Sequence, residues 1–239
     1  IYSVVVAFPI AIWLCSDAVL SKGSKVIGST NAEIWAFLWG HFWVRQSLFE
    51  EGSWPMYTQL SNFPEGGALW LKDPLMLALM LPVQLLFGIA IAVTVSQILL
   101  FLLSSLGTFL LCRSLGANRL AAVCSGLLYA FCPHTLGEAF NGNIEALNTC
   151  WLPLWLWSWL AAMRHPQVTT IIKSSVLLFC LLVSNQYWAI ALAMVSIPLG
   201  LQQLYRRKEH WRSALFGGLT SLIGGLMLFA PAGWWIWKS

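Results

Sequence analysis

The sequence predicts an all-α, polytopic integral membrane protein with about seven transmembrane helices. Of its 239 residues, 59% are hydrophobic and only 9% are charged, and the mean hydropathy is +0.74. Soluble domains carry about 25% charged residues, so a soluble enzyme and a nucleic-acid binder are both excluded. The apolar residues gather in runs of about 20, the length that crosses about 30 Å of hydrocarbon. Segments of about ten residues that alternate apolar and polar side chains, typical of a membrane β-barrel, are absent. Helices are the other structure that satisfies all backbone hydrogen bonds inside lipid.

Seven apolar segments are expected to span the bilayer, namely 1–16, 88–112, 119–136, 144–163, 168–185, 187–205 and 212–236. Residues 75–87 are apolar but short, and Pro82 is expected to break them into a re-entrant or interfacial piece. We therefore divide one membrane domain, 1–239, into a long first loop (17–87) and a transmembrane bundle (88–236). The chain begins inside an apolar run without Met and stops just after another, so we expect it to be a piece of a longer protein.

The placement of charge predicts the orientation of the spans. If 17–87 lies outside, the inner connections hold eight of the 13 basic residues but a single acid, Glu209. Short basic loops on the inner side are what the positive-inside rule requires, so 17–87 is expected to be extracytoplasmic, in a bacterial inner membrane. The segment Arg206-Arg207-Lys208 is also expected to touch anionic lipid. The inner basic residues are Arg113, Arg119, Arg164, Lys173, Arg206, Arg207, Lys208 and Arg212.

The outer segment is the unusual part of the chain. Residues 32–49 have helical composition without proline, and they place His41, Arg45 and Gln46 close together on one face of a predicted amphipathic helix. This helix is expected to lie at the membrane surface or to pack under a domain. Gly, Pro, Asn and Ser are frequent in the following residues, which predict an ordered loop with turns at 54–55, 64–67 and 73–74. A long loop of this kind is usually functional unless it is disordered.

Features inside the spans are expected to be structural. Gly217, Ser221 and Gly225 recur every four residues, a pattern that lets helices pack closely. The six cysteines lie in or beside apolar runs without a CxxC pair, and they are expected to be small buried side chains. Charges are almost absent from the span interiors, which argues against ion-coupled transport.

Six motifs follow the first span in a recognisable order. They are GSWP at 52–55, NFPEGG at 62–67, DPL at 73–75, LCRSLG at 111–116, AVCSGLLYAFCP at 122–133 and GNIEALNTCWLP at 142–153. Together with the tryptophan-rich helix before them, they resemble the N-terminal part of bacterial integral-membrane glycosyltransferases of the GT-C superfamily, in the multi-span branch close to family 39. The resemblance covers roughly residues 1–165.

The resemblance implies a sugar transfer from a polyprenyl-phosphate donor on the outer face. Enzymes of this superfamily place an essential Asp or Glu just after the first span, and Glu33 is the best match by position, with Asp17 as the alternative. The Gly-Asp context frequent in the family is replaced by GSTNAE at 28–33. A carboxylate with a raised pKa could take the proton of an acceptor hydroxyl.

The departing phosphate would need cationic or metal partners. No metal-ligand cluster or cofactor motif is evident, and a divalent metal stays open. Each candidate has a structural alternative: Glu33 could favour a helix dipole, Asp73 could form a turn, and Asn185 could cap a helix end. The predicted substrate-binding residues are His41, Arg45, Lys72, Asp73, His134, Glu138, Glu145, Asn185 and Tyr187.

Three functions therefore stand after the sequence analysis. The first is a GT-C-like glycosyltransferase whose partners are membrane lipids and a polyprenyl-phosphate sugar. The second is a non-catalytic subunit that offers this scaffold to other membrane proteins, and the third is a lipid or solute transporter. A nucleic-acid partner is not expected.

Overall fold

The chain folds into a bundle of α-helices in the computed structural model, which describes residues 2–29, 33–60, 64–69 and 71–238, the last four by their backbone alone. Among the described residues, four helical segments are long and apolar enough to cross a membrane, which confirms the all-α class and supports the membrane assignment: Ile89–Ser114, Arg119–Asn141, Trp188–Arg206 and Lys208–Trp234. The strands among the described residues are a two-residue antiparallel pair, β1 (Tyr57–Thr58) and β2 (Gly67–Ala68).

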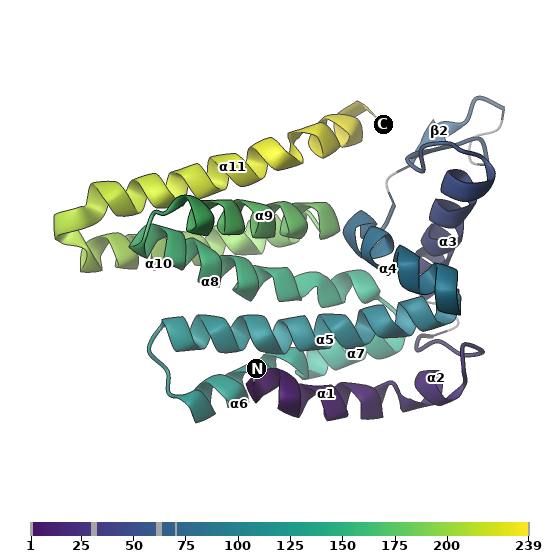
Figure 1. Ribbon diagram of the computed structural model, residues 1–239, viewed down its shortest axis with the longest axis horizontal. Helices are drawn as coiled ribbons and strands as arrows, with labels where there is room; N and C mark the ends of the chain where they lie inside the picture. Colours follow the sequence, from purple (N-terminus) through teal and green to yellow (C-terminus); the bar gives the residue numbers. More distant parts are fainter. Residues whose placement is uncertain (1, 30–32, 61–63, 70, 239) are drawn as a thin grey trace.

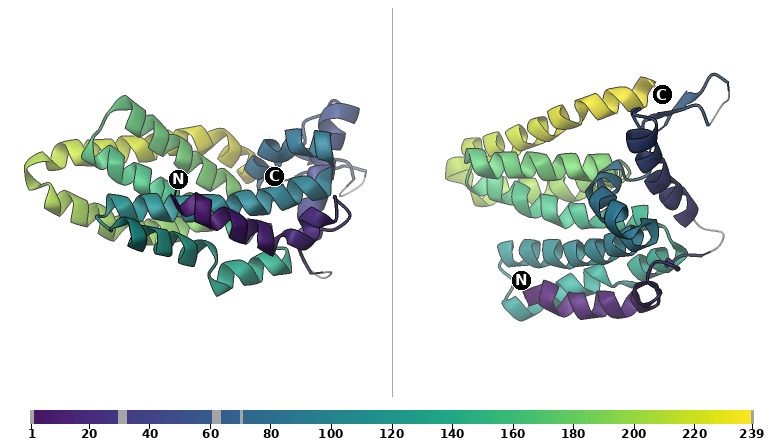
Figure 2. Two further views of the ribbon diagram at one scale, coloured as in Figure 1. Left: turned by 60° about the horizontal axis from the view of Figure 1, so that its bottom comes forward. Right: turned by 45° about the vertical axis from the view of Figure 1, so that its right-hand side comes forward.

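The long helices lie side by side and run along the length of the molecule (Figures 1 and 2). The segment between α1 and α5 gathers at one end, at the right of Figure 1, whereas the turns between α5 and α6, α8 and α9, and α10 and α11 lie at the other. The helices of the bundle are α1 (Tyr2–Leu14), α5 (Ile89–Ser114), α6 (Arg119–Ala130), α7 (Pro133–Asn141), α8 (Trp151–Arg164), α9 (Val168–Ser184), α10 (Trp188–Arg206) and α11 (Trp211–Lys238).

Helices form at each of the seven predicted spans, but three of them are shorter than a bilayer crossing requires. α1, α8 and α9 have 13, 14 and 17 residues, whereas a perpendicular crossing takes about 20. The predicted span 119–136 is divided into α6 and α7, because Pro133 starts the second helix at a position where its missing N–H costs no hydrogen bond. The count of seven therefore stays a prediction.

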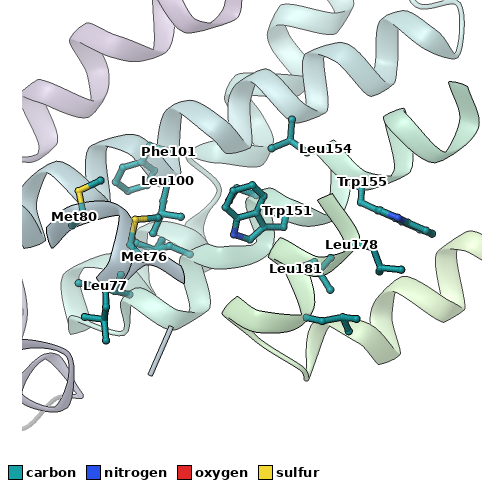
Figure 3. Packing of buried hydrophobic residues seen from close by; sticks show 14 of the residues in the cluster. Met76, Leu77, Met80, Leu100, Phe101, Trp151, Leu154, Trp155, Leu178 and Leu181 are labelled. Carbon is teal, nitrogen blue, oxygen red and sulfur yellow. The ribbon is translucent and has the colours of Figure 1, made fainter. Parts of the chain in front are cut away.

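The central helix of the bundle is α8, which packs against α5, α9, α10 and α11. Its side chains Trp151, Trp155 and Trp159 are all buried, and the rings of the last two are stacked with centroids 5.1 Å apart. Figure 3 shows two of these indoles beside leucines of α8 and α9 and, across the core, Met76 of α4. Aromatic side chains of this size remove a large apolar area from contact with surrounding solvent or lipid.

The small-residue stripe of α11 allows the predicted close packing. A side chain at Gly217 would collide with the backbone carbonyl of Ala162 in α8, and a Cβ at Gly225 would lie 2.6 Å from Leu178 in α9. Between them, the Ser175 hydroxyl donates to the Ser221 carbonyl at 3.1 Å. The two helices therefore contact α11 through its backbone, as the four-residue spacing predicts.

The outer segment forms a compact cap on one end of the bundle. Trp43 of α3 donates its indole N–H to the Pro55 carbonyl at 2.8 Å, which fixes the hairpin of β1 and β2 to the helix. One prediction was wrong: Pro82 does not break its segment, because α4 continues through it and both Pro82 and Ala78, four residues earlier, lie on the exposed side. The elements of this cap are α2 (Ser16–Leu20), α3 (Ile34–Arg45), the π-helix η1 (Gln46–Glu50), β1, β2 and α4 (Pro74–Phe87).

Candidate functional site

Four of the predicted site residues meet in one cluster beneath the cap. The Lys72 ammonium lies 2.6 Å from Glu33 Oε2 and 3.9 Å from Glu145 Oε2, and Asp73 follows directly in the chain. Positions 33, 72–73 and 145 thus converge from three distant parts of the sequence. We call Glu33, Lys72, Asp73 and Glu145 the carboxylate cluster.

Local backbone geometry explains how Glu145 reaches Glu33. Gly142 ends α7 in the left-handed region, with φ of +80°, and its Cα lies against the start of α3: a Cβ there would be 2.8 Å from Cβ of Ile34. Only glycine fits both requirements at this position. The 3₁₀ helix η2 (Ile144–Cys150) follows, and it is capped by Asn143, whose side chain accepts the N–H of Ala146. The close approach places Glu145 beside the residue that precedes Ile34.

Asp73 is buried and fully hydrogen-bonded. Its Oδ1 accepts the Met76 N–H at 3.1 Å and caps α4, while its Oδ2 accepts the Asn148 side-chain N–H at 2.9 Å. Its φ of +49° lies in the left-handed region, which Asp and Asn tolerate better than most residues. The turn-forming alternative therefore describes Asp73 well, and Asp73 also ties α4 to η2.

The carboxylates carry more charge than the single ammonium can balance. Burial raises the pKa of Asp73 to about 6, although the hydrogen bonds from Asn148 and Met76 lower it. Desolvation also raises the pKa of Glu145, Lys72 lowers it, and Glu33 raises it again. Desolvation and repulsion between carboxylates both favour the neutral acid, so both groups bind a proton more readily than an exposed carboxylate does.

Glu33 is held by its partner rather than by a helix end. It occupies the residue before α3, yet its side chain makes no capping hydrogen bond there. Its carboxylate goes to Lys72 instead, with the two side chains 55% and 35% exposed. Three residues of the GSTNAE segment at 28–33, namely Thr30, Asn31 and Ala32, lie outside the described residues.

An apolar cavity of about 570 Å³ lies beside the cluster. Leu71 and Pro74 line it, and they flank Lys72 and Asp73 in the chain. Its walls come from α3, η1, the hairpin segment, α4, α9 and α11. The four cluster residues are not among its lining residues, so the cluster adjoins this apolar space through its chain neighbours, and the space itself suits a hydrocarbon chain.

The other basic candidates lie apart from the cluster. The structure does not bring His41, Arg45 and Gln46 together in one polar face as predicted, because His41 turns inward: its Nδ1 lies 2.9 Å from Gln84 Oε1, and Gln84 donates to the His41 carbonyl at 2.8 Å. Burial lowers the pKa of His41. Arg45 is exposed and lines a separate open groove with Lys25 and Phe42.

The remaining predicted residues occupy ordinary surface or structural positions. Asp17 and His134 are exposed, in α2 and at the start of α7. Glu138 accepts the Asn143 side-chain N–H at 2.9 Å, so it supports the turn into η2. Asn185 is buried and accepts the Tyr187 N–H at 2.9 Å, as expected of a cap, while the Tyr187 side chain is exposed.

Sequence reasoning missed two residues that shape this end of the molecule. Asn148 donates a hydrogen bond to Asp73, and Gln84 holds His41. Each is a polar residue inside an apolar run, and that was the available signal, because a buried polar side chain needs a partner. Within the described residues, no group of three or more His, Cys, Asp or Glu side chains could hold a metal ion.

Comparisons of the chain with protein families, with curated proteins and with solved structures give no match.

Proposed function

We propose that the protein is a membrane glycosyltransferase of GT-C type that transfers a sugar from a polyprenyl-phosphate donor. One observation carries the proposal: in a bundle with helices of membrane-spanning length, carboxylates with an ammonium and an apolar cavity share one chain segment, because Leu71 and Pro74 line the cavity and flank Lys72 and Asp73. The donor needs this pair of environments, because its prenyl chain is apolar while its phosphate and sugar are polar. The cluster would then lie on the extracytoplasmic side of a bacterial inner membrane.

Glu145 is the better candidate for the general base. It is half-buried and desolvation raises its pKa, and a carboxylate of raised pKa is the better base toward an acceptor hydroxyl. Glu33 would keep Lys72 in position, and Asp73 would hold the backbone of Lys72 in place through α4 and η2. The sequence-based choice of Glu33 as the base is thereby revised within the same cluster.

The excess negative charge bears on how a phosphate could approach. Glu33 and Glu145 both lie within 4 Å of one nitrogen, so a phosphate arriving at Lys72 would meet two carboxylates. Mg²⁺ is usually bound by one or two carboxylates together with substrate phosphate oxygens and water. We therefore expect the reaction to need a divalent cation that binds with the donor.

Transfer can be tested with the purified protein and a panel of polyprenyl-phosphate sugars, with release of polyprenyl phosphate as the readout. We expect Glu145→Gln to lower the rate by about 10²- to 10⁴-fold, the usual contribution of a general base. Glu50→Gln removes an exposed carboxylate of the same cap and is the matched control. Full activity of the Glu145→Gln protein would refute the role of Glu145, and the absence of release with every donor would refute the proposal.

A non-catalytic subunit is the second candidate, and one observation favours it. Trp35, Trp39, Phe42 and Arg45 line an open groove of about 930 Å³ on the outer face of the cap. Aromatic residues and arginine are enriched in protein interfaces. Co-purification of a membrane partner that is lost on Trp39→Ala, together with a protein that releases no polyprenyl phosphate, would favour this function over the first.

A further inference from the structure

The end of the bundle opposite the carboxylate cluster contains a cavity of about 470 Å³ lined mainly by basic residues. It lies where the turn between α8 and α9 meets the connection from α10 to α11, which runs through the short 3₁₀ helix η3 (Lys208–His210) (Figure 1). We call it the basic cavity. Its lining residues are Arg164, His165, Tyr205, Arg206, Arg207, Lys208, Glu209 and His210.

Backbone carbonyls, and not carboxylates, hold the two half-buried arginines of the cavity. Arg164 donates to the Ser114 carbonyl at the end of α5, at 2.8 Å. Arg207 donates in turn to the Arg164 carbonyl. These bonds link the ends of α5, α8 and α10, and among the described residues neither guanidinium group has a carboxylate in an ion pair.

The cavity therefore keeps a net positive charge. Within the described part of the chain, Arg164, Arg206, Arg207 and Lys208 form no ion pair, although Glu209 also lines the cavity. Desolvation lowers the pKa of Arg164, and the nearby charges of Arg207 and Arg206 lower it further. Arginine does not lose its proton in proteins, so a bound anion is what can relieve this repulsion.

We propose that the basic cavity binds a phosphate group, with the headgroup of an anionic membrane lipid as its main source. The planar donors of arginine match phosphate oxygens in pairs, and more than one arginine borders this space. The cavity also opens at the ends of the spanning helices, where lipid headgroups lie, and basic pockets between such helices bind anionic headgroups. This site is independent of the sugar transfer proposed above.

Binding can be measured on the intact chain in a neutral detergent, by native mass spectrometry with phosphatidylglycerol or phosphatidylcholine and by calorimetry with pyrophosphate. The test variant is Arg206→Gln/Lys208→Gln, because both side chains are exposed and neither guanidinium nor ammonium holds another helix end. We expect about 25-fold weaker binding of phosphatidylglycerol, at about fivefold for each basic residue. Phosphatidylcholine, whose headgroup has no net charge, should bind weakly to both proteins.

The matched control is Arg113→Gln/Arg119→Gln, which removes the same charge from exposed residues beside the α5–α6 turn, outside the cavity lining. Its binding should stay within about twofold of the unsubstituted protein. If phosphatidylglycerol binding depends on the cavity residues, the ligand is a lipid headgroup; if only pyrophosphate binding does, it is a soluble phosphate, and both outcomes support a phosphate site. Equal losses in the test and control variants, or no loss in either, would overturn it.

Discussion

Replacing Asp73 by asparagine should stabilise the protein at neutral pH, even though the side chain is buried and fully bonded. Its pKa rises from 3.8 to about 6 on folding, so the folded state binds a proton more tightly than the unfolded chain. The contribution of Asp73 to stability is therefore fully present below pH 3.8 and is lost as the pH rises to about 6. A difference of about two units corresponds to about 3 kcal/mol above that window.

Asparagine can replace the neutral carboxyl without a new structural cost. Its Oδ1 can still accept the Met76 N–H and cap α4, and it tolerates the left-handed backbone at φ +49°. The neighbouring Asn148 has a buried Oδ1 without a partner. A rotation of the Asn148 amide would therefore offer this oxygen to the new side-chain N–H, and the hydrogen bond would be kept.

The assay is reversible unfolding in mixed micelles at pH 7.5 and pH 4. We expect Asp73→Asn to be more stable than the unsubstituted protein by about 3 kcal/mol at pH 7.5 and by less than about 1 kcal/mol at pH 4. Asp17→Asn, at an exposed position, should change the free energy of unfolding by less than about 0.5 kcal/mol. A variant that is less stable at pH 7.5 would refute the reasoning, because the ionised carboxylate would then be favourable in the fold.

Three further predictions test the packing and the ion pair with the same unfolding measurement. Gly217→Ala should destabilise by about 1–3 kcal/mol because its Cβ meets the Ala162 carbonyl, while Gly137→Ala, which meets nothing within 4 Å, should be neutral or stabilising; equal effects would contradict the close contact. Gln84→Leu should cost about 2–4 kcal/mol because it removes both hydrogen bonds to His41, and an unchanged stability would show that this pair does not hold α3 to α4. Lys72→Ala should change stability by less than about 1 kcal/mol, since its ion pair is half exposed, yet abolish sugar transfer; a large loss of stability would assign Lys72 a structural role.

The sequence predicted the helical elements better than their lengths. Hydropathy finds apolar segments, and helices lie at all seven of them. Hydropathy does not predict that the short helix α8 lies at the centre of the bundle. A hydropathy scale treats the indole as weakly apolar, whereas the buried tryptophans of α8 pack with their whole ring area. It also predicted a break at Pro82, but a proline on the exposed side of a helix removes one hydrogen bond without ending the helix.

The candidate site could be assembled from the sequence only as separate residues. Glu33, Lys72, Asp73 and Glu145 were each singled out, but nothing in their spacing places positions 33 and 145 side by side. The contact depends on Gly142, where the chain turns back on the start of α3. His41 was predicted to lie on a polar face, but it is buried. Its hydrogen-bond partner Gln84 lies 43 residues later in the chain, so the local sequence pattern could not predict this contact.

The two ends of the bundle hold surplus charge of opposite sign, and this charge can be neutralised in different ways at the two ends. At the carboxylate cluster the surplus is negative, and Asp73 and Glu145 can neutralise it by taking up protons because their pKa values are raised. At the basic cavity the surplus is carried largely by arginines, which keep their protons. Proton transfer is therefore possible at the first end, and anion binding is the remaining way to relieve repulsion at the second. The proposed sugar transfer therefore belongs to the carboxylate end, and the proposed phosphate binding belongs to the basic end.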